Sequence, residues 1–158
     1  MRRAYISLGS NMGDKRGNIA LALEHLDAIT GIHVAARSHD YRTPPWGDTD
    51  QDWFINACAA LDTSLTPEAL LVACLAIETR MGRIRTRKWG PRVIDIDLLD
   101  YDGLTLISND LTLPHPHLME RAFVLIPLAE IASDLMISGR SVTATAHALA
   151  DPAIIPYD

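Results

Sequence analysis

Residues 93–103 read Val93-Ile94-Asp95-Ile96-Asp97-Leu98-Leu99-Asp100-Tyr101-Asp102-Gly103. The mainly apolar residues up to Tyr101 are typical of a β-strand, and Asp102-Gly103 is typical of the tight turn of a hairpin. We therefore expect this strand to pair with a second strand around residues 104–107. Because a two-residue turn joins antiparallel strands, this stretch favours an antiparallel sheet.

The elements on either side of this strand predict the fold class. Thr66-Pro67 is a typical helix start, because a capping hydroxyl precedes a proline at the first helical position. Strands are expected at about 4–8, 32–41, 54–61, 93–101 and 104–107. Helices are expected at about 18–30, 66–81, 118–131 and 142–149. This order predicts an α+β fold in which helices cover a mostly antiparallel sheet.

Length and composition exclude several classes of protein. The 158 residues suit a single domain, and the 48% hydrophobic and 22% charged fractions are ordinary for a globular chain. The net charge of −6 argues against a surface that binds nucleic acid or anionic lipid as a whole. Cys58 and Cys74 have no metal-ligand spacing, so we expect buried, reduced thiols. With no signal-peptide pattern and no transmembrane run, we expect a cytoplasmic protein.

Positive charge is concentrated in one segment just before the strand at 93–101. Six of the fourteen Lys and Arg residues lie between positions 80 and 92, namely Arg80, Arg83, Arg85, Arg87, Lys88 and Arg92. Arginine side chains bind phosphate oxygens in a bidentate manner. The segment therefore predicts an anionic partner.

Asp95 and Asp97 are the strongest candidates for chemistry. Residues two apart in a strand share a face, so both carboxylates should lie side by side. They would repel each other unless a cation neutralised them, and Mg²⁺ prefers a few carboxylates together with water and substrate phosphates. The alternative is a solvated strand face or a pair of salt bridges to arginines. Beside the basic segment, the pair predicts a site for a nucleotide polyphosphate, although no Walker motif occurs.

Other side chains are candidates for binding a flat heterocycle or a phosphate. Trp46 and Trp89 lie in predicted loops, where their rings can stack on a ligand. Asn56 lies in an apolar strand, where it would bind either a ligand edge or the backbone. His115 and His117 have the spacing of transition-metal ligands but no third soft ligand, so we favour a phosphate contact for His115.

Four motifs stand out along the chain, namely Tyr5-Ile6-Ser7-Leu8-Gly9-Ser10-Asn11, Tyr41-Arg42-Thr43-Pro44-Pro45, Trp89-Gly90-Pro91-Arg92-Val93-Ile94-Asp95-Ile96-Asp97 and Leu113-Pro114-His115. In order and spacing they resemble the motifs of the 6-hydroxymethyl-7,8-dihydropterin pyrophosphokinase family of the folate pathway. The resemblance extends over nearly the whole chain. It implies a ferredoxin-like α+β fold and transfer of the β,γ-pyrophosphoryl unit of ATP to a pterin hydroxymethyl oxygen, with release of AMP.

The resemblance also implies roles for individual residues. Asp95 and Asp97 resemble ligands of two Mg²⁺ ions, and with Arg83 and Arg92 they resemble the catalytic set. The implied nucleotide contacts are Glu78, Arg85, Arg92, Ile96, Leu98, Thr112, His115 and Arg121. The implied pterin contacts are Thr43, Pro44, Pro45, Trp46, Phe54, Asn56, Trp89 and Phe123, with two aromatic rings sandwiching the base.

Departures from the family pattern occur at both sites. Phe54 stands where some relatives have tyrosine, and Trp46 stands where some have a smaller apolar residue. Asp110 stands where some have a basic residue, and Pro116 where some have tyrosine. We therefore expect the nucleotide contacts around residues 110–116 to differ most from those of relatives.

The expected partners are small molecules, ATP and the pterin, bound by a monomer without nucleic acid or membrane. A nucleotide-sugar transferase also uses an Asp-x-Asp pair, but this short chain has no recognisable sugar-nucleotide domain. A single-strand nucleic-acid binder would use the basic segment and its tryptophan, but the overall acidity disfavours it. For an enzyme, we expect the segments 43–52 and 82–92 to close over bound substrates.

Overall fold

The computed structural model describes residues 1–47, 49–82 and 91–157. Within these residues, a six-stranded antiparallel sheet has the order β10-β3-β4-β1-β5, and β2 also pairs with β4. Its strands are β1 (Arg2–Ser10), β2 (Ile32–Arg37), β3 (Tyr41–Thr43), β4 (Phe54–Thr63), β5 (Asp95–Tyr101) and β10 (Ile155–Pro156). The strand β5 therefore forms one edge of the sheet.

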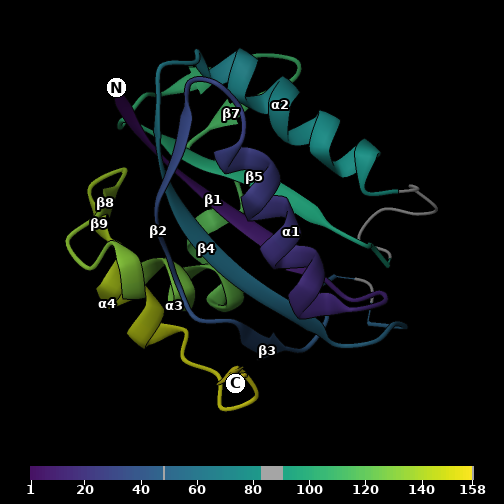
Figure 1. Ribbon diagram of the computed structural model, residues 1–158. Coiled ribbons are helices and arrows are strands. Elements are labelled where there is room, and N and C mark those ends of the chain that lie inside the picture. Colours follow the sequence, from purple (N-terminus) through teal and green to yellow (C-terminus); the bar gives the residue numbers. More distant parts are fainter. Residues whose placement is uncertain (48, 83–90, 158) are drawn as a thin grey trace.

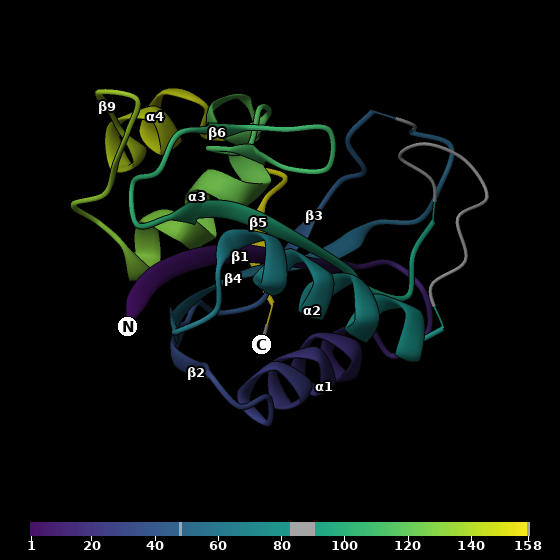
Figure 2. The same ribbon diagram turned by 90° about the horizontal axis from the view of Figure 1, so that it is seen from above.

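Helices cover both faces of the sheet (Figure 1). The helices α1 (Lys15–Asp27) and α2 (Pro67–Arg80) lie on one face. The helices α3 (Ala122–Ile131) and α4 (Val142–Ala148) lie on the other, and a 3-10 turn, η1 (Leu118–Glu120), precedes α3. Figure 2, seen from above, shows the two helix pairs on opposite sides of β1, β4 and β5. The predicted α+β fold with a helix-covered antiparallel sheet is confirmed.

Two hydrophobic cores follow from the alternation of side chains along the strands. Ile6 and Ile96 are among the buried residues that pack under α1 and α2. Cys58 and Leu99 pack with Leu125 of α3 in the second core. The central strands are apolar on both faces because each face is covered by helices.

Side-chain caps determine where the first two helices begin. The carboxylate of Asp14 accepts a hydrogen bond from Gly17 N, and the hydroxyl of Thr66 accepts one from Ala69 N. The start predicted at Thr66-Pro67 is confirmed. The first helix begins at Lys15 rather than Asn18, because the cap is an aspartate that precedes the apolar stripe.

The single strand expected at 32–41 is wrong, because the chain forms two strands there. The pairing of β2 with β4 shifts register between Val34 and Ala36. Ser38 N still donates to Cys58 O at 2.9 Å, but Cys58 N donates to the Ser38 hydroxyl at 2.9 Å instead of to a backbone carbonyl. Asp40 binds the side chains of Arg37 and Arg16 before β3 begins. Polar side chains therefore interrupt the strand.

The hairpin partner expected after Asp102-Gly103 is also wrong. Both residues have positive φ, 51° and 72°, and the turn forms. The next strand, β6 (Leu106–Ile107), pairs instead with β7 (Thr112–Leu113). The outer edge of β5 is occupied by other groups, because Ile96 N donates to the Glu78 carboxylate at 2.7 Å and Leu99 O accepts from His115 N at 2.9 Å.

Three short strands carry no signal in the sequence. A second hairpin joins β8 (Met136–Ile137) to β9 (Arg140–Ser141), and β10 pairs with β3 near the end of the chain. Each has two residues, which is too few for a pattern of alternation. The expected buried, free thiols of Cys58 and Cys74 are confirmed, and burial raises the pKa of Cys74 to about 12.

None of the helices in the described part of the chain has the length and apolarity that crossing a bilayer requires.

Candidate active site

Three neighbouring strands bring polar residues together on one surface of the sheet. Gly9 of β1 lies opposite both Asn56 of β4 and Asp95 of β5, and Ser7 lies opposite Asp97. Directly opposed residues share a face, so these residues form adjoining rows across the sheet. The side chains of Ile96 and its alternate neighbours are buried on the other face, as the sequence predicts.

The two aspartates are flanked by arginines. Nη1 of Arg92 lies 2.7 Å from Oδ2 of Asp95, and Nη1 of Arg121 lies 3.8 Å from Oδ2 of Asp97. Burial and, to a smaller extent, the charge of Asp95 together raise the pKa of Asp97 to about 7, and Arg121 opposes the rise. A cation beside the pair would stabilise the ionised form of Asp97.

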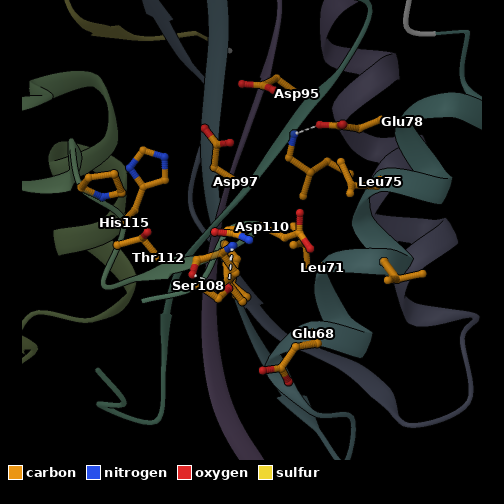
Figure 3. A pocket seen from close by; sticks show the side chains of 16 residues that line it. Glu68, Leu71, Leu75, Glu78, Asp95, Asp97, Ser108, Asp110, Thr112 and His115 are labelled. Atoms are coloured by element: carbon orange, nitrogen blue, oxygen red, sulfur yellow. Dashed lines mark hydrogen bonds between the residues drawn. The ribbon is translucent and has the colours of Figure 1, made fainter. Parts of the chain in front are cut away.

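Two pockets meet at this pair of aspartates. The large pocket, a cavity of about 550 Å³, lies between α2, β5 and residues 108–116 (Figure 3). The small pocket, about 50 Å³, lies over β1 and β4. Among the described residues, Asp95 and Asp97 line both pockets. A group in one pocket can therefore reach a group in the other across the two carboxylates.

The large pocket has an apolar wall and a polar wall. Leu71 and Leu75 project from α2 on one side, and Thr112 and His115 lie on the other (Figure 3). Ile96 and Leu98 of β5 also line it. The apolar wall suits a ligand with a flat apolar part, whereas the carboxylates of the lining would repel anionic groups unless a cation binds between them.

Glu78 fixes the edge of β5 against α2. Its side chain is buried, and Oε2 accepts a hydrogen bond from Ile96 N at 2.7 Å. A side chain of α2 thereby binds a backbone N–H that a neighbouring strand would otherwise bind. The large pocket lies along the same edge, and both Glu78 and Ile96 line it.

His115 is a neutral hydrogen-bond donor. Burial lowers its pKa to about 4, and the charges of Arg121 and His117 contribute to the decrease. Its Nδ1 accepts a hydrogen bond from His117 N at 3.1 Å, which assigns the ring proton to Nε2. The Nε2–H can donate to a phosphate in the large pocket.

The small pocket has aromatic walls. The rings of Trp46 and Phe123 are 6.4 Å apart and tilted by 56°. The guanidinium carbon of Arg121 lies 4.4 Å from the centre of the Trp46 ring. Phe54 and Asn56 complete the wall formed by β4. These groups can hold a flat heterocycle and bind its polar edge.

Gly9 makes room for Asn56 in the small pocket. A Cβ at Gly9 would lie 2.5 Å from Asn56 Oδ1, which is closer than any side chain permits. The other end of the amide is fixed, because Asn56 Nδ2 donates to Thr43 Oγ1 at 2.6 Å. Asn56 therefore lines the small pocket and bonds the side chain of Thr43 rather than the backbone, and its contact with a ligand stays a prediction.

The structure brings most of the predicted site residues together. The large pocket contains Glu78, Asp95, Ile96, Asp97, Leu98, Thr112 and His115. The small pocket contains Pro44, Trp46, Phe54, Asn56, Arg92, Asp95, Asp97, Arg121 and Phe123. Thr43 lies behind Asn56, and Pro45 lines neither pocket. Arg83, Arg85 and Trp89 lie outside the described residues, as does most of the segment 82–92.

Arg121 lies beside Asp97 in the small pocket, and its expected contact with a phosphate stays a prediction. The resemblance places it among the nucleotide contacts, and it lines the small pocket beside Asp97 and against Trp46. From there it can reach an anion only at the junction of the two pockets.

Sequence reasoning missed the apolar wall of the large pocket and two small residues of the small pocket. Leu71, Val72 and Leu75 lie outside the buried stripe of α2, and Val72 is 65% exposed. A helix that is apolar beyond its buried stripe is a signal for such a wall. Ser7 and Gly9 line the small pocket, but only the strand register places them there.

The donor set suits magnesium rather than a transition metal. No group of three or more His, Cys, Asp or Glu side chains that could hold a metal ion occurs in residues 1–47, 49–82 and 91–157. Mg²⁺ is bound in many sites by one or two carboxylates plus water and substrate phosphates. Asp95 and Asp97 fit that donor set.

A family model described as 7,8-dihydro-6-hydroxymethylpterin-pyrophosphokinase (HPPK) matches residues 5–133. The chain belongs to the HPPK family. Residues 134–158, which include α4 and β10, lie outside the matched segment. The resemblance inferred from the motifs is confirmed.

Individual members of the HPPK family match nearly the whole chain. A 2-amino-4-hydroxy-6-hydroxymethyldihydropteridine pyrophosphokinase of Methylorubrum extorquens is 63% identical over 142 residues, which are 90% of this chain and 90% of the relative. A protein of the same name from Pseudomonas aeruginosa is 43% identical over 85% of this chain and 83% of the relative.

Solved structures share the fold at low sequence identity. A Plasmodium falciparum HPPK-DHPS in complex with pteroate has a TM-score of 0.76 over 93% of this chain, with 14% identity. This chain spans 42% of that HPPK-DHPS chain. The HPPK fold found here therefore also occurs as one part of longer proteins.

Proposed function

We propose that this chain transfers the β,γ-pyrophosphoryl unit of ATP to the hydroxymethyl oxygen of 6-hydroxymethyl-7,8-dihydropterin. The products are AMP and the pterin diphosphate, in folate biosynthesis. Membership of the HPPK family supports the reaction. The observation that supports its location is that Asp95 and Asp97 line both pockets.

ATP occupies the large pocket in this proposal. The adenine lies against the apolar wall formed by Leu71 and Leu75, and the phosphates extend toward the aspartates. His115 donates its Nε2–H to a phosphate oxygen, and Thr112 lies beside it. Glu78 contributes indirectly, because it holds the edge of β5.

The pterin occupies the small pocket. The bicycle packs against the aromatic wall of this pocket once the rings of Trp46 and Phe123, which lie 6.4 Å apart and are tilted by 56°, move apart, and Asn56 binds a polar edge. The hydroxymethyl group then points to the aspartates, where it meets the transferred phosphate. This orientation aligns the attacking oxygen with the phosphorus atom before reaction.

Asp95 and Asp97 hold magnesium, and we propose two ions, as in the family resemblance. When bound, Mg²⁺ neutralises phosphate charge and favours deprotonation of the pterin hydroxyl. Arg92 and Arg121 already lie against these carboxylates and can stabilise negative charge that develops on the phosphates. Arg83, Arg85 and Trp89 keep the phosphate and pterin roles predicted from the sequence.

We further propose that residues 1–158 act as one domain and as a monomer in the cytoplasm. Light scattering of the purified chain measures its mass directly. A dimer at working concentrations would contradict the monomer. The closure of segments 43–52 and 82–92 is tested by hydrogen exchange with and without both ligands, and unchanged protection would contradict it.

The reaction itself is tested by incubating the chain with ATP, Mg²⁺ and 6-hydroxymethyl-7,8-dihydropterin. We expect AMP and pterin diphosphate in equal amounts, and no turnover in excess EDTA. Formation of ADP and a pterin monophosphate, or a requirement for a sugar acceptor, would contradict the proposal. The second result would favour the nucleotide-sugar transferase.

A further inference from the structure

The last described residues pack behind the small pocket. In the strand β10, Ile155 pairs with Arg42 and Pro156 pairs with Tyr41 of β3. Tyr157 N then donates to Asp40 O at 2.9 Å. β3 has only three residues, and its other neighbour is β4. The C-terminal residues therefore complete the sheet on the free side of β3.

The ring of Tyr157 also contacts the beginning of β4. It lies 5.6 Å from the ring of Trp53, the residue immediately before β4. Lys15 Nζ lies 3.3 Å from the centre of the Trp53 ring, and the guanidinium carbon of Arg16 lies 5.6 Å from that of Tyr157. Aromatic and cationic groups thus form a compact cluster at the ends of β3, β4 and β10.

This cluster lies on the opposite face of the sheet from the small pocket. Thr43 is opposite Phe54 in the register of β3 and β4, so both side chains lie on the face of the sheet that carries the small pocket, which Phe54 lines. Arg42 and Trp53 are their neighbours in sequence and face the other side, where Arg42 lies 4.5 Å from the Trp53 ring. Contacts on the back of the sheet therefore fix β3, which Pro44 follows, and β4, which begins at Phe54, both of which lie beside the small pocket.

We infer that residues 155–157 are positioning residues for the pterin side of the site, with Tyr157 as the main contact. They hold the start of β4 and the whole of β3 in the arrangement that shapes the small pocket. They touch neither substrate, because no residue of this segment lines either pocket. The inference rests on the proposed function, since it requires the pterin to occupy the small pocket.

The test compares Tyr157→Ala with two variants. Tyr157→Phe keeps the ring and is the conservative change. Leu149→Ala is the matched control, because Leu149 is 38% exposed and Tyr157 is 37% exposed, but Leu149 lies at the end of α4. The dissociation constants for 6-hydroxymethyl-7,8-dihydropterin and for Mg²⁺ with a non-hydrolysable ATP analogue are measured separately, together with KM and kcat.

We expect Tyr157→Ala to weaken pterin binding about fivefold and to raise the pterin KM similarly, while nucleotide binding changes less than twofold. Tyr157→Phe and Leu149→Ala should match the wild type. Unchanged pterin binding in folded Tyr157→Ala, or an equal loss for both ligands, would overturn the inference. If the alanine variant does not fold, Tyr157→Leu serves the same comparison. Failure of the wild type to bind pterin would instead overturn the proposed function.

Discussion

Gly9 and Asn56 are opposed in neighbouring strands so closely that a Cβ on Gly9 would lie 2.5 Å from Asn56 Oδ1. We expect Gly9→Ala to displace the Asn56 side chain and to cost about 1–3 kcal/mol of stability. The pterin KM should rise about tenfold, because Asn56 no longer presents the same edge. Steady-state kinetics with each substrate varied in turn measures the effect.

The ATP KM of Gly9→Ala is the internal control, since Gly9 does not line the large pocket. Equal increases in both KM values would show that the substitution disturbs the site as a whole.

Leu75 tests the apolar wall of the large pocket. Leu75→Ala removes apolar contact area from the proposed adenine site, so the nucleotide should bind about threefold to tenfold more weakly. Leu21→Ala is the matched control, because Leu21 of α1 is 41% exposed and Leu75 is 43% exposed. Calorimetric titration with an ATP analogue and Mg²⁺ compares the variants. If Leu75→Ala and Leu21→Ala bind the ATP analogue with equal affinity, the adenine does not lie against Leu75.

Glu78 tests how the edge of β5 is held. Glu78→Ala leaves Ile96 N without its carboxylate acceptor inside the protein, so stability should fall by about 1–3 kcal/mol. Glu68→Ala on the exposed side of the same helix should change stability by less than about 0.5 kcal/mol. Urea denaturation measures both. A stability loss for Glu78→Ala no larger than that for Glu68→Ala would contradict a structural role for this contact.

Glu130 predicts how stability depends on pH. Burial raises its pKa, but hydrogen bonds from Tyr41 and from the backbone and ring of His39 outweigh burial, so the pKa lies below the ordinary value of 4.5. A lowered pKa in the folded state stabilises the fold above the unfolded pKa, and this stabilisation is lost as the pH falls through the folded pKa.

The stability advantage of the wild type over Glu130→Gln should therefore be constant near neutral pH and shrink below about pH 4.5. Denaturation at several pH values measures it, with Glu24→Gln, an exposed position on α1, as the control. If the stability advantage of the wild type over Glu130→Gln grew as the pH fell, the lowered pKa of Glu130 would be contradicted.

Local patterns predicted the parts of the fold that depend on one segment. The start of α2 at Pro67 follows from the Thr66 cap, and the shared face of Asp95 and Asp97 follows from alternation along β5. The partner of β5 could not be predicted in this way. Its outer edge is satisfied by Glu78 and by His115, which come from distant parts of the chain, so the turn at Asp102-Gly103 leads elsewhere.

The candidate site was predictable where the motif residues themselves carry the chemistry. The aspartates, Trp46, Asn56 and His115 were found from residue type and from the family resemblance. Gly9 was missed, because its role arises from the pairing of β1 with β4. Trp53 lies on the far face of the sheet from the small pocket, since it is one position from Phe54 in the strand register.

Asp97 is the residue that best tests whether the carboxylate pair at the junction of the two pockets takes part in catalysis. Its raised pKa means that the ionised side chain destabilises the fold, and that this effect develops as the pH rises from the ordinary pKa of 3.8 and is complete above the folded pKa of about 7. Asp97→Asn should therefore be at least as stable as the wild type at pH 8, while losing most of its activity. Asp100→Asn, in the same strand but outside both pockets, is the control.

The most direct measurement is the rate at which wild type, Asp97→Asn and Asp100→Asn form AMP from ATP, Mg²⁺ and the reduced pterin at pH 8. We expect Asp97→Asn to lose about a thousandfold or more in rate with an undiminished melting temperature, and Asp100→Asn to remain close to wild type. Wild-type rates of AMP formation by Asp97→Asn would contradict the metal-binding and catalytic role of the pair.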